Sequence, residues 1–308
     1  MSGEKILINE VGLRDGLQSQ PRHLTLDERE TMAEALFATG IRHVEIGSFV
    51  SPKAVPQMAG TGELVARLSP PPGVSYSALV PNMKGYELAR AAGVETVAVV
   101  VSATETMNRK NINMGLDETL AVAEAVIRRG REEGVRVQAY LAVAWECPFE
   151  GPTPPAVVRD QAQELAAYGA DEIVIADTIG AANPAAVRAL MDDLVADHGE
   201  ERLACHFHDT RAMGLANVYA AGESGIRRFD SSVGGLGGCP FAPGAKGNVA
   251  TEDVVMLCEA MGFDTGVDMP ALLAAVATVS ELIGTPQGGR AHYWLSKNPG
   301  MNPGKNAA

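Results

Sequence analysis

The feature that most restricts the fold of this chain is a regular alternation of short apolar segments with longer, helix-like ones. Capping residues such as Thr25, Asn183 and Gly169 mark several helix ends. The expected strands are residues 6–11, 43–46, 75–79, 96–101, 136–141, 172–176, 203–208 and 228–233. The expected helices are residues 26–38, 61–68, 84–92, 116–132, 155–168, 184–196, 213–224 and 251–261. Eight such units predict an α/β fold, a closed (β/α)8 TIM barrel.

A doubly wound sheet is the alternative architecture for alternating strands and helices. No glycine-rich dinucleotide fingerprint follows the first strand, which favours the barrel. A further helix is expected at residues 269–283. We therefore expect residues 1–308 to form one catalytic domain, with a C-terminal helical extension, about residues 265–308, that packs on the barrel or on a partner subunit.

Charge and cysteine content restrict the partners and the compartment. The formal net charge of −13 argues against binding to nucleic acid or to anionic membranes, so a phosphorylated substrate needs locally positive groups. The four cysteines show no CxxC spacing, which is typical of a reduced, intracellular chain. No leader or membrane-span pattern is present in the sequence, and a cytoplasmic protein is expected.

Polar side chains gather where the expected strands end, which is the catalytic face of a TIM barrel. His206 and His208 alternate with apolar residues at the end of the seventh strand, so both point the same way and form half of a metal site. Asp15 follows the first strand and can add a ligand. The alternative is a pair of hydrogen-bonded histidines in a barrel mouth.

Several motifs resemble the 3-hydroxy-3-methylglutaryl-CoA lyase family. They are VGLRDGLQ, EIGSFVSPKAVPQM, NRKNIN, ADTIG, HFHDT and SSVGGLGGCPFAPGAKGNVATED, in the family's order across roughly residues 6–265. The resemblance implies a divalent metal, Mg²⁺ or Mn²⁺, bound by Asp15, His206, His208 and Asn248. Mixed oxygen and imidazole ligands suit these ions, although they do not distinguish them from Zn²⁺.

The reaction that the resemblance implies is cleavage of the C2–C3 bond of a 3-hydroxyacyl thioester, giving acetyl-CoA and a ketone. Arg14 is expected to stabilise the enolate oxygen, with a surface salt bridge as its alternative role. Glu45 is expected to orient the site, with a structural salt bridge as its alternative role. By resemblance, His206 and Cys239 carry the proton transfers. Cys239 lies in a glycine-rich loop, which taken alone is equally typical of a phosphate-binding loop. Cys147 also matches the family, but is expected to be an ordinary buried thiol.

The acyl-CoA substrate needs cations and amides near its phosphates. The candidates are Arg109, Lys110 and Asn111, expected in a loop after the fourth strand, and a solvated loop is their alternative role. Gln18, Ser48 and Lys53 are lesser candidates around the mouth. A homo-oligomer, dimer or tetramer, is expected.

Some positions depart from the family pattern. Ala142, Val143, Trp145 and Val174 replace small or polar residues, which predicts a less polar acyl pocket, and Arg211 could hold a terminal carboxylate. The substrate alternatives are therefore 3-hydroxy-3-methylglutaryl-CoA and another 3-hydroxy-3-methylacyl-CoA such as citramalyl-CoA. A Claisen-type synthase is disfavoured by Leu17 and by the missing room for a regulatory domain. A non-catalytic barrel is disfavoured by the intact metal set.

Overall fold

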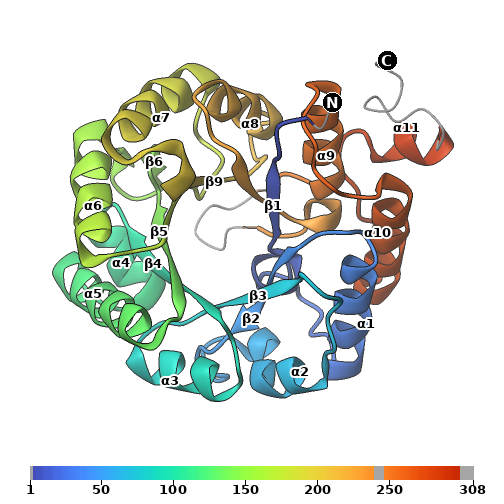
Figure 1. Ribbon diagram of the computed structural model, residues 1–308, viewed down its shortest axis with the longest axis horizontal. Helices are drawn as coiled ribbons and strands as arrows, with labels where there is room; N and C mark the ends of the chain where they lie inside the picture. Colours follow the sequence, from blue (N-terminus) through green and yellow to red (C-terminus); the bar gives the residue numbers. More distant parts are fainter. Residues whose placement is uncertain (1–2, 239–245, 299–308) are drawn as a thin grey trace.

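The computed structural model describes residues 3–238 and 246–298. Eight parallel strands close into a barrel in the order β1-β10-β9-β8-β5-β4-β3-β2, and the helices form an outer layer around it (Figure 1). The barrel strands are β1 (Leu7–Glu10), β2 (His43–Ser48), β3 (Ser75–Leu79), β4 (Thr96–Ser102), β5 (Arg136–Ala142), β8 (Glu172–Asp177), β9 (Leu203–Phe207) and β10 (Arg228–Ser231). The prediction of a TIM barrel is confirmed.

The helices follow the strands in the expected alternation. They are α1 (Leu26–Phe37), α2 (Thr61–Arg67), α3 (Met83–Ala91), α4 (Glu105–Ile112), α5 (Leu116–Glu133), α6 (Pro155–Tyr168), α7 (Pro184–His198), α8 (Gly214–Glu223), α9 (Thr251–Ala260), α10 (Met269–Ile283) and α11 (His292–Lys297). The sequence did not predict α4, α11 or the small antiparallel pair β6 (Glu146–Cys147) and β7 (Gly151–Pro152).

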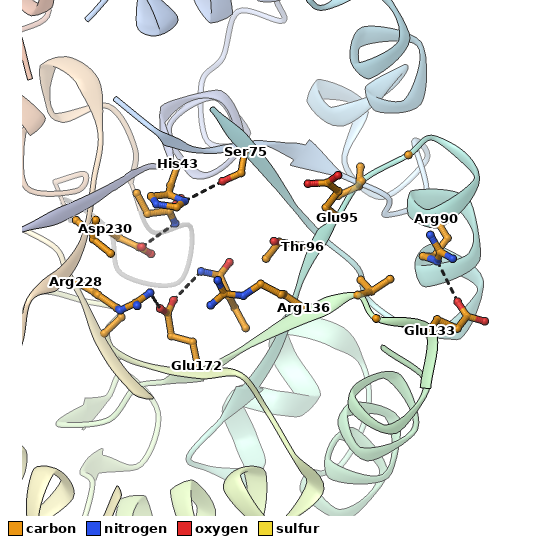
Figure 2. A pocket seen from close by; sticks show the side chains of 18 of the residues that line it. His43, Ser75, Arg90, Glu95, Thr96, Glu133, Arg136, Glu172, Arg228 and Asp230 are labelled. Atoms are coloured by element: carbon orange, nitrogen blue, oxygen red, sulfur yellow. Dashed lines mark hydrogen bonds and ion pairs between the residues drawn. The ribbon is translucent and has the colours of Figure 1, made fainter. Parts of the chain in front are cut away.

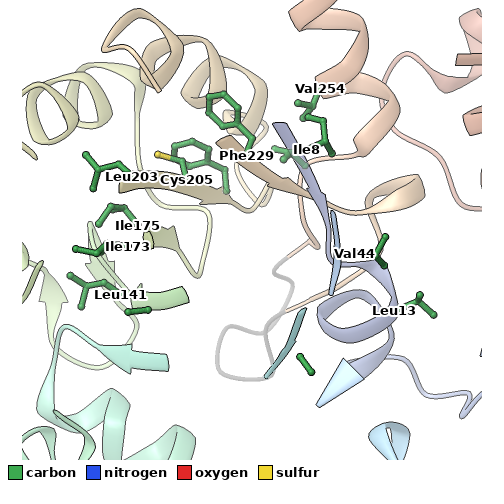
Figure 3. Close-up of a cluster of buried hydrophobic side chains, with 14 of the residues drawn as sticks. Ile8, Leu13, Val44, Leu141, Ile173, Ile175, Leu203, Cys205, Phe229 and Val254 are labelled. Atoms are coloured by element: carbon green, nitrogen blue, oxygen red, sulfur yellow. The ribbon is translucent and has the colours of Figure 1, made fainter. Parts of the chain in front are cut away.

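Two apolar layers result from the alternation of side chains along the barrel strands. The outward side chains, such as Ile8, Ile175 and Phe229, are buried beneath the helices (Figure 3). The inward apolar cluster is much smaller and consists of Ala98, Tyr140, Val174 and Ala204, with Val100 against it. On either side of this cluster, the barrel holds a cavity lined partly by charged groups.

The C-terminal elements pack on the barrel layer. Helix α10 lies against α1, and Leu295 of α11 is buried in the same core. Lys5 forms an isolated parallel bridge with Asp264, which joins the start of the described chain to the segment before α10. Within residues 3–238 and 246–298, no helix combines the length and apolar character that crossing a bilayer requires.

Candidate metal centre and active-site cavity

Residues from three separate segments meet at the end of the barrel where the strands finish. A single π-helical turn, η1 (Gly12–Gly16), follows β1 and carries Arg14 and Asp15. Gly12 is needed there because a Cβ atom would lie 2.6 Å from Oε1 of Glu10. His206 is on β9, and His208 follows that strand and forms a bridge with Asn248.

The four predicted ligands lie together. One ligand atom each of Asp15, His206 and His208 falls within 4.8 Å of the others. The side-chain amide of Asn248 donates to Oδ2 of Asp15 over 2.8 Å. Oδ1 of Asn248 is buried and has no hydrogen-bond partner among the described residues. An orphaned amide oxygen beside a carboxylate and two imidazoles is a donor set that fits Mg²⁺ or Mn²⁺.

Arg14 is buried, with 6% of its surface exposed, between two carboxylates. Its Nε lies 2.7 Å from Glu45 and its Nη1 lies 2.6 Å from Asp15. Burial by itself lowers the pKa of Arg14, but the charges of Glu45 and Asp15 outweigh it and raise this pKa. The cation is therefore permanent and faces the cluster.

The two carboxylates beside Arg14 differ in their surroundings. Burial favours the neutral acid at both. At Glu45 burial prevails over Arg14 and raises the pKa to about 7. At Asp15 the charge of Arg14 and the hydrogen bond with His208 prevail, and the pKa lies well below its usual range. Asp15 is therefore ionised, and Oε1 of the buried Glu45 lacks a hydrogen-bond partner among the described residues.

Asp230 and Tyr140 belong to the site but were not predicted. Oδ2 of Asp230 lies 2.9 Å from Nδ1 of His206 and 2.8 Å from the Tyr140 hydroxyl. Burial alone lowers the pKa of His206, whereas the hydrogen bond and charge of Asp230 raise it above the ordinary value. An acidic residue at an inward position of the eighth strand was the available signal.

A cavity of about 1260 Å³ opens beside the cluster. Gln18, Ser48 and Asn111 line it, as do Arg14, Asp15, His206 and His208. The predicted loop after the fourth strand is wrong, because Arg109, Lys110 and Asn111 belong to helix α4. Arg109 points outward and pairs with Glu105 at 2.5 Å, and neither Arg109 nor Lys110 lines the cavity. Lys53 does not line it either.

Only one of the four positions predicted for the acyl pocket lines this cavity. Ala142 does so, together with Leu79, Val100 and Ala176. Val174 lies in the inward cluster of the barrel. Val143 and Trp145 instead pack in the outer core, where Trp145 lies 5.7 Å from Phe207 between ring centroids. The prediction is wrong for these two residues, because side chains beyond the end of β5 no longer follow the strand's alternation.

Other predicted residues fall elsewhere. The guanidinium of Arg211 is half exposed and pairs with Glu146 at 3.1 Å. Cys147 is a buried free thiol that accepts a hydrogen bond from Thr104, in agreement with the structural role expected for it. Cys239 lies outside the described residues.

Comparisons with known proteins agree with this geometry. The HMGL-like family model matches residues 5–279. Hydroxymethylglutaryl-CoA lyase of Pseudomonas mevalonii is 44% identical over 95% of this chain and 97% of its own. The 3-hydroxy-3-isohexenylglutaryl-CoA/hydroxy-methylglutaryl-CoA lyase of Pseudomonas aeruginosa is 43% identical over 94% and 96% of the two chains.

Solved structures give the same result. A crystal structure of hydroxymethylglutaryl-CoA lyase from Pseudomonas aeruginosa superposes with a TM-score of 0.92, at 42% identity over 96% of this chain and 99% of that one. An HMG-CoA lyase from Acinetobacter baumannii, solved with coenzyme A and 3-methylmalate, has a TM-score of 0.90 at 35% identity over 94% of each chain. The chain therefore belongs to the HMGL-like family.

Proposed function

We propose that this protein is a carbon–carbon lyase that cleaves 3-hydroxy-3-methylglutaryl-CoA to acetyl-CoA and acetoacetate. The observation that carries the proposal is the cluster of Asp15, His206, His208 and Asn248 beside the buried cation of Arg14, at the mouth of a large cavity. The HMGL-like family membership and the similarity to two hydroxymethylglutaryl-CoA lyases support it.

The four clustered residues would hold a divalent cation, Mg²⁺ or Mn²⁺. When bound, that ion supplies Lewis-acid polarisation of the substrate's oxygens. Arg14 places a fixed positive charge where the thioester oxygen becomes an enolate, and this preorganised charge lowers the barrier of C2–C3 cleavage. Nε of Arg14 donates a hydrogen bond to the carboxylate of Glu45. This bond fixes the direction in which the guanidinium points.

The proton transfers are assigned to Cys239. His206 was the other candidate, but its Nδ1 is engaged by Asp230, and its Nε2 is the atom left for the metal. Cys239 follows the glycine-rich sequence Gly234–Gly238, and a thiol carries protons when nearby positive charge or backbone donors lower its pKa. His206 is thus proposed as a ligand rather than as the proton carrier.

The acyl-CoA is proposed to enter the cavity beside α4. Gln18, Ser48 and Asn111 offer amide and hydroxyl groups to the thioester arm. Arg109 and Lys110 lie on the exposed side of the same helix, where their charges can reach phosphates. The relative solved with coenzyme A supports this class of substrate.

The location and assembly of the protein stay predictions. Buried free thiols at Cys147, Cys205 and Cys258 support the proposed cytoplasmic location, because reduced cysteines are typical of that compartment. A homodimer or homotetramer is expected from the sequence.

The decisive experiment measures acetyl-CoA release from a panel of hydroxyacyl-CoAs. Chelated protein should be inactive and should regain turnover with Mg²⁺ or Mn²⁺. The panel holds the methylglutaryl, citramalyl and longer 3-alkyl thioesters, since the wall formed by Leu79, Val100, Ala142 and Ala176 is apolar. The methylglutaryl thioester should have the highest kcat/KM.

Two variants complete the panel experiment. His208→Asn should abolish the metal response, whereas His198→Asn, which alters a histidine at the end of α7, should retain it. Full turnover by metal-free protein would exclude the proposed reaction. A higher kcat/KM for citramalyl-CoA would transfer the assignment to the alternative substrate.

A further inference from the structure

Asp230 lies in the middle of the barrel, between the active-site cluster and a second cavity. The second cavity has a volume of about 640 Å³ and is lined by residues at the starts of the strands, so we call it the N-terminal cavity. His43, Ser75, Glu172 and Arg228 surround it, and Asp230 lies at its inner side (Figure 2). Asp230 is only 3% exposed.

Three hydrogen bonds fix the carboxylate of Asp230. Its Oδ1 accepts from the side-chain amide of Asn9 over 2.9 Å. Its Oδ2 accepts from the Tyr140 hydroxyl over 2.8 Å and lies 2.9 Å from Nδ1 of His206. These partners come from β1, β5 and β9, while Asp230 is on β10, so four barrel strands set the orientation of one carboxylate.

The chemistry of a carboxylate then determines which nitrogen of His206 carries the hydrogen. A carboxylate oxygen accepts hydrogen bonds and has no hydrogen to donate, so Nδ1 must be the N–H donor. In the neutral ring Nε2 is consequently unprotonated, with a lone pair for a metal. Asp15 and His208 belong to the same cluster, in which one ligand atom of each residue lies within 4.8 Å of the others.

The second histidine of the cluster has no comparable support. Nδ1 of His208 is buried and lacks a hydrogen-bond partner among the described residues. The rings of His206 and His208 lie 5.1 Å apart between centroids, so both face the same space. Of the two imidazoles, His206 is therefore the one whose Nδ1 is held by a carboxylate.

We propose that Asp230 is a positioning residue that holds His206 in the Nδ1–H tautomer and presents Nε2 as a preformed ligand for the divalent cation. Carboxylates that orient ligating histidines in this way typically raise metal affinity, and their loss lowers it roughly 10–100-fold. Tyr140 and Asn9 act one step further out, by holding the carboxylate itself. The proposal rests on the proposed function for the presence of a metal.

The tautomer can be measured without any activity assay. In ¹⁵N-histidine-labelled, metal-free protein, at a pH that keeps the ring neutral, long-range ¹H–¹⁵N correlation spectra should show His206 with a protonated Nδ1. In Asp230→Asn the amide can donate to Nδ1, so the proton should move to Nε2. Mn²⁺ titration followed by electron paramagnetic resonance should show affinity reduced roughly 10–100-fold.

Two further variants separate positioning from general stability. Tyr140→Phe removes one of the two hydrogen bonds to Oδ2 and should weaken Mn²⁺ binding less than Asp230→Asn. Glu172→Gln is the matched control, because Glu172 lines the N-terminal cavity and pairs with Arg228 at 2.9 Å but does not touch His206. It should leave the tautomer and the Mn²⁺ affinity unchanged.

The outcomes are distinguishable from those of the substrate panel. A protonated Nε2 on His206 in the wild type overturns the proposal, even if Asp230→Asn does not fold. Unchanged Mn²⁺ affinity in folded Asp230→Asn, or an equal loss in Glu172→Gln, also overturns it. Absence of lyase activity with the expected tautomer and Mn²⁺ binding would instead count against the proposed reaction alone.

Discussion

Among single residues, the properties of the site come from the pairing of buried charges. Arg14 is shared between Glu45 and Asp15, and it also lines the cavity. A guanidinium held by two carboxylates cannot rotate freely, so little reorganisation is needed when negative charge develops on the substrate. Replacing Arg14 would also leave both of these buried carboxylates without their ion-pair partner.

Arg14→Gln removes this charge while keeping a polar side chain. We expect kcat to fall by about 10²–10³-fold, on the scale of losing an oxyanion donor, with a smaller change in KM. Steady-state kinetics on the methylglutaryl thioester give both constants. Arg22→Gln is the control, because Arg22 is exposed and pairs only with Glu28 in the described structure. Near-normal kcat in Arg14→Gln would remove Arg14 from the mechanism.

At the scale of secondary-structure elements, helix α1 illustrates how local sequence sets an element that tertiary packing then uses. Thr25 accepts a hydrogen bond from the Glu28 backbone amide over 3.2 Å, and the Glu28 side chain accepts from the Thr25 backbone amide over 2.8 Å. This capping box starts a helix whose Met32 and Leu36 are fully buried. The same helix lies against α10.

Thr25→Ala should therefore lower the free energy of unfolding by about 1 kcal/mol, because the backbone amide at the helix start loses the hydroxyl that accepts its hydrogen bond. Urea denaturation followed by circular dichroism measures the free energy of unfolding of both proteins. Thr31→Ala is the matched control, since Thr31 lies inside α1 and its hydroxyl bonds only the carbonyl of Asp27 in the described structure. Equal losses in the two variants would show that the cap contributes nothing specific.

For the whole molecule, two buried glutamates join segments that are distant in the sequence: Glu10 joins the first strand to residues after β10, and Glu252 joins the turn after β10 to the segment before α11. Glu10 accepts hydrogen bonds from the Val233 amide over 2.9 Å and from the Thr251 hydroxyl over 2.5 Å. Glu252 accepts from the amides of Gly234, over 3.1 Å, and Gly289, over 2.6 Å. Burial raises the pKa of both glutamates to about 7.

This raised pKa predicts how stability depends on pH. Between pH 4.5, the ordinary pKa of a glutamate, and about pH 7, the folded chain binds more protons at Glu252 than the unfolded chain does. Stability from this group is thus complete below pH 4.5 and is lost as pH rises through 7. At about 1.36 kcal/mol for each tenfold change in proton affinity, the loss is of the order of 3 kcal/mol.

Glu252→Gln should flatten that part of the pH profile. Urea unfolding between about pH 5 and pH 8 gives the slope for wild type and variant, and the difference in slope isolates the group from other titrations. Glu281→Gln, on exposed surface of α10, should leave the slope unchanged. Parallel profiles for wild type and Glu252→Gln would contradict the prediction, whatever the vertical offset.

The sequence by itself determined the barrel and the grouping of Asp15, His206 and His208, whereas Asn248 was added by the family resemblance. Every expected strand and helix end lies within two residues of its observed position, because apolar periodicity and caps are local signals. The carboxyl ends of the barrel strands share one face, so Asp15, His206 and His208 could be brought together from strand order alone.

Tertiary structure decided the rest. Helix α4 has a short, polar sequence, and it forms where Met107 and Asn108 are buried. The side chains of Val143 and Trp145 pack in the outer core, because both residues lie beyond the end of β5. Tyr140 and Asp230 lie 90 positions apart in the chain and meet only inside the closed barrel. Alternation along each strand predicts that both side chains point inward, but β5 and β10 are not neighbours in the barrel, and only its closure brings these two residues within hydrogen-bond distance.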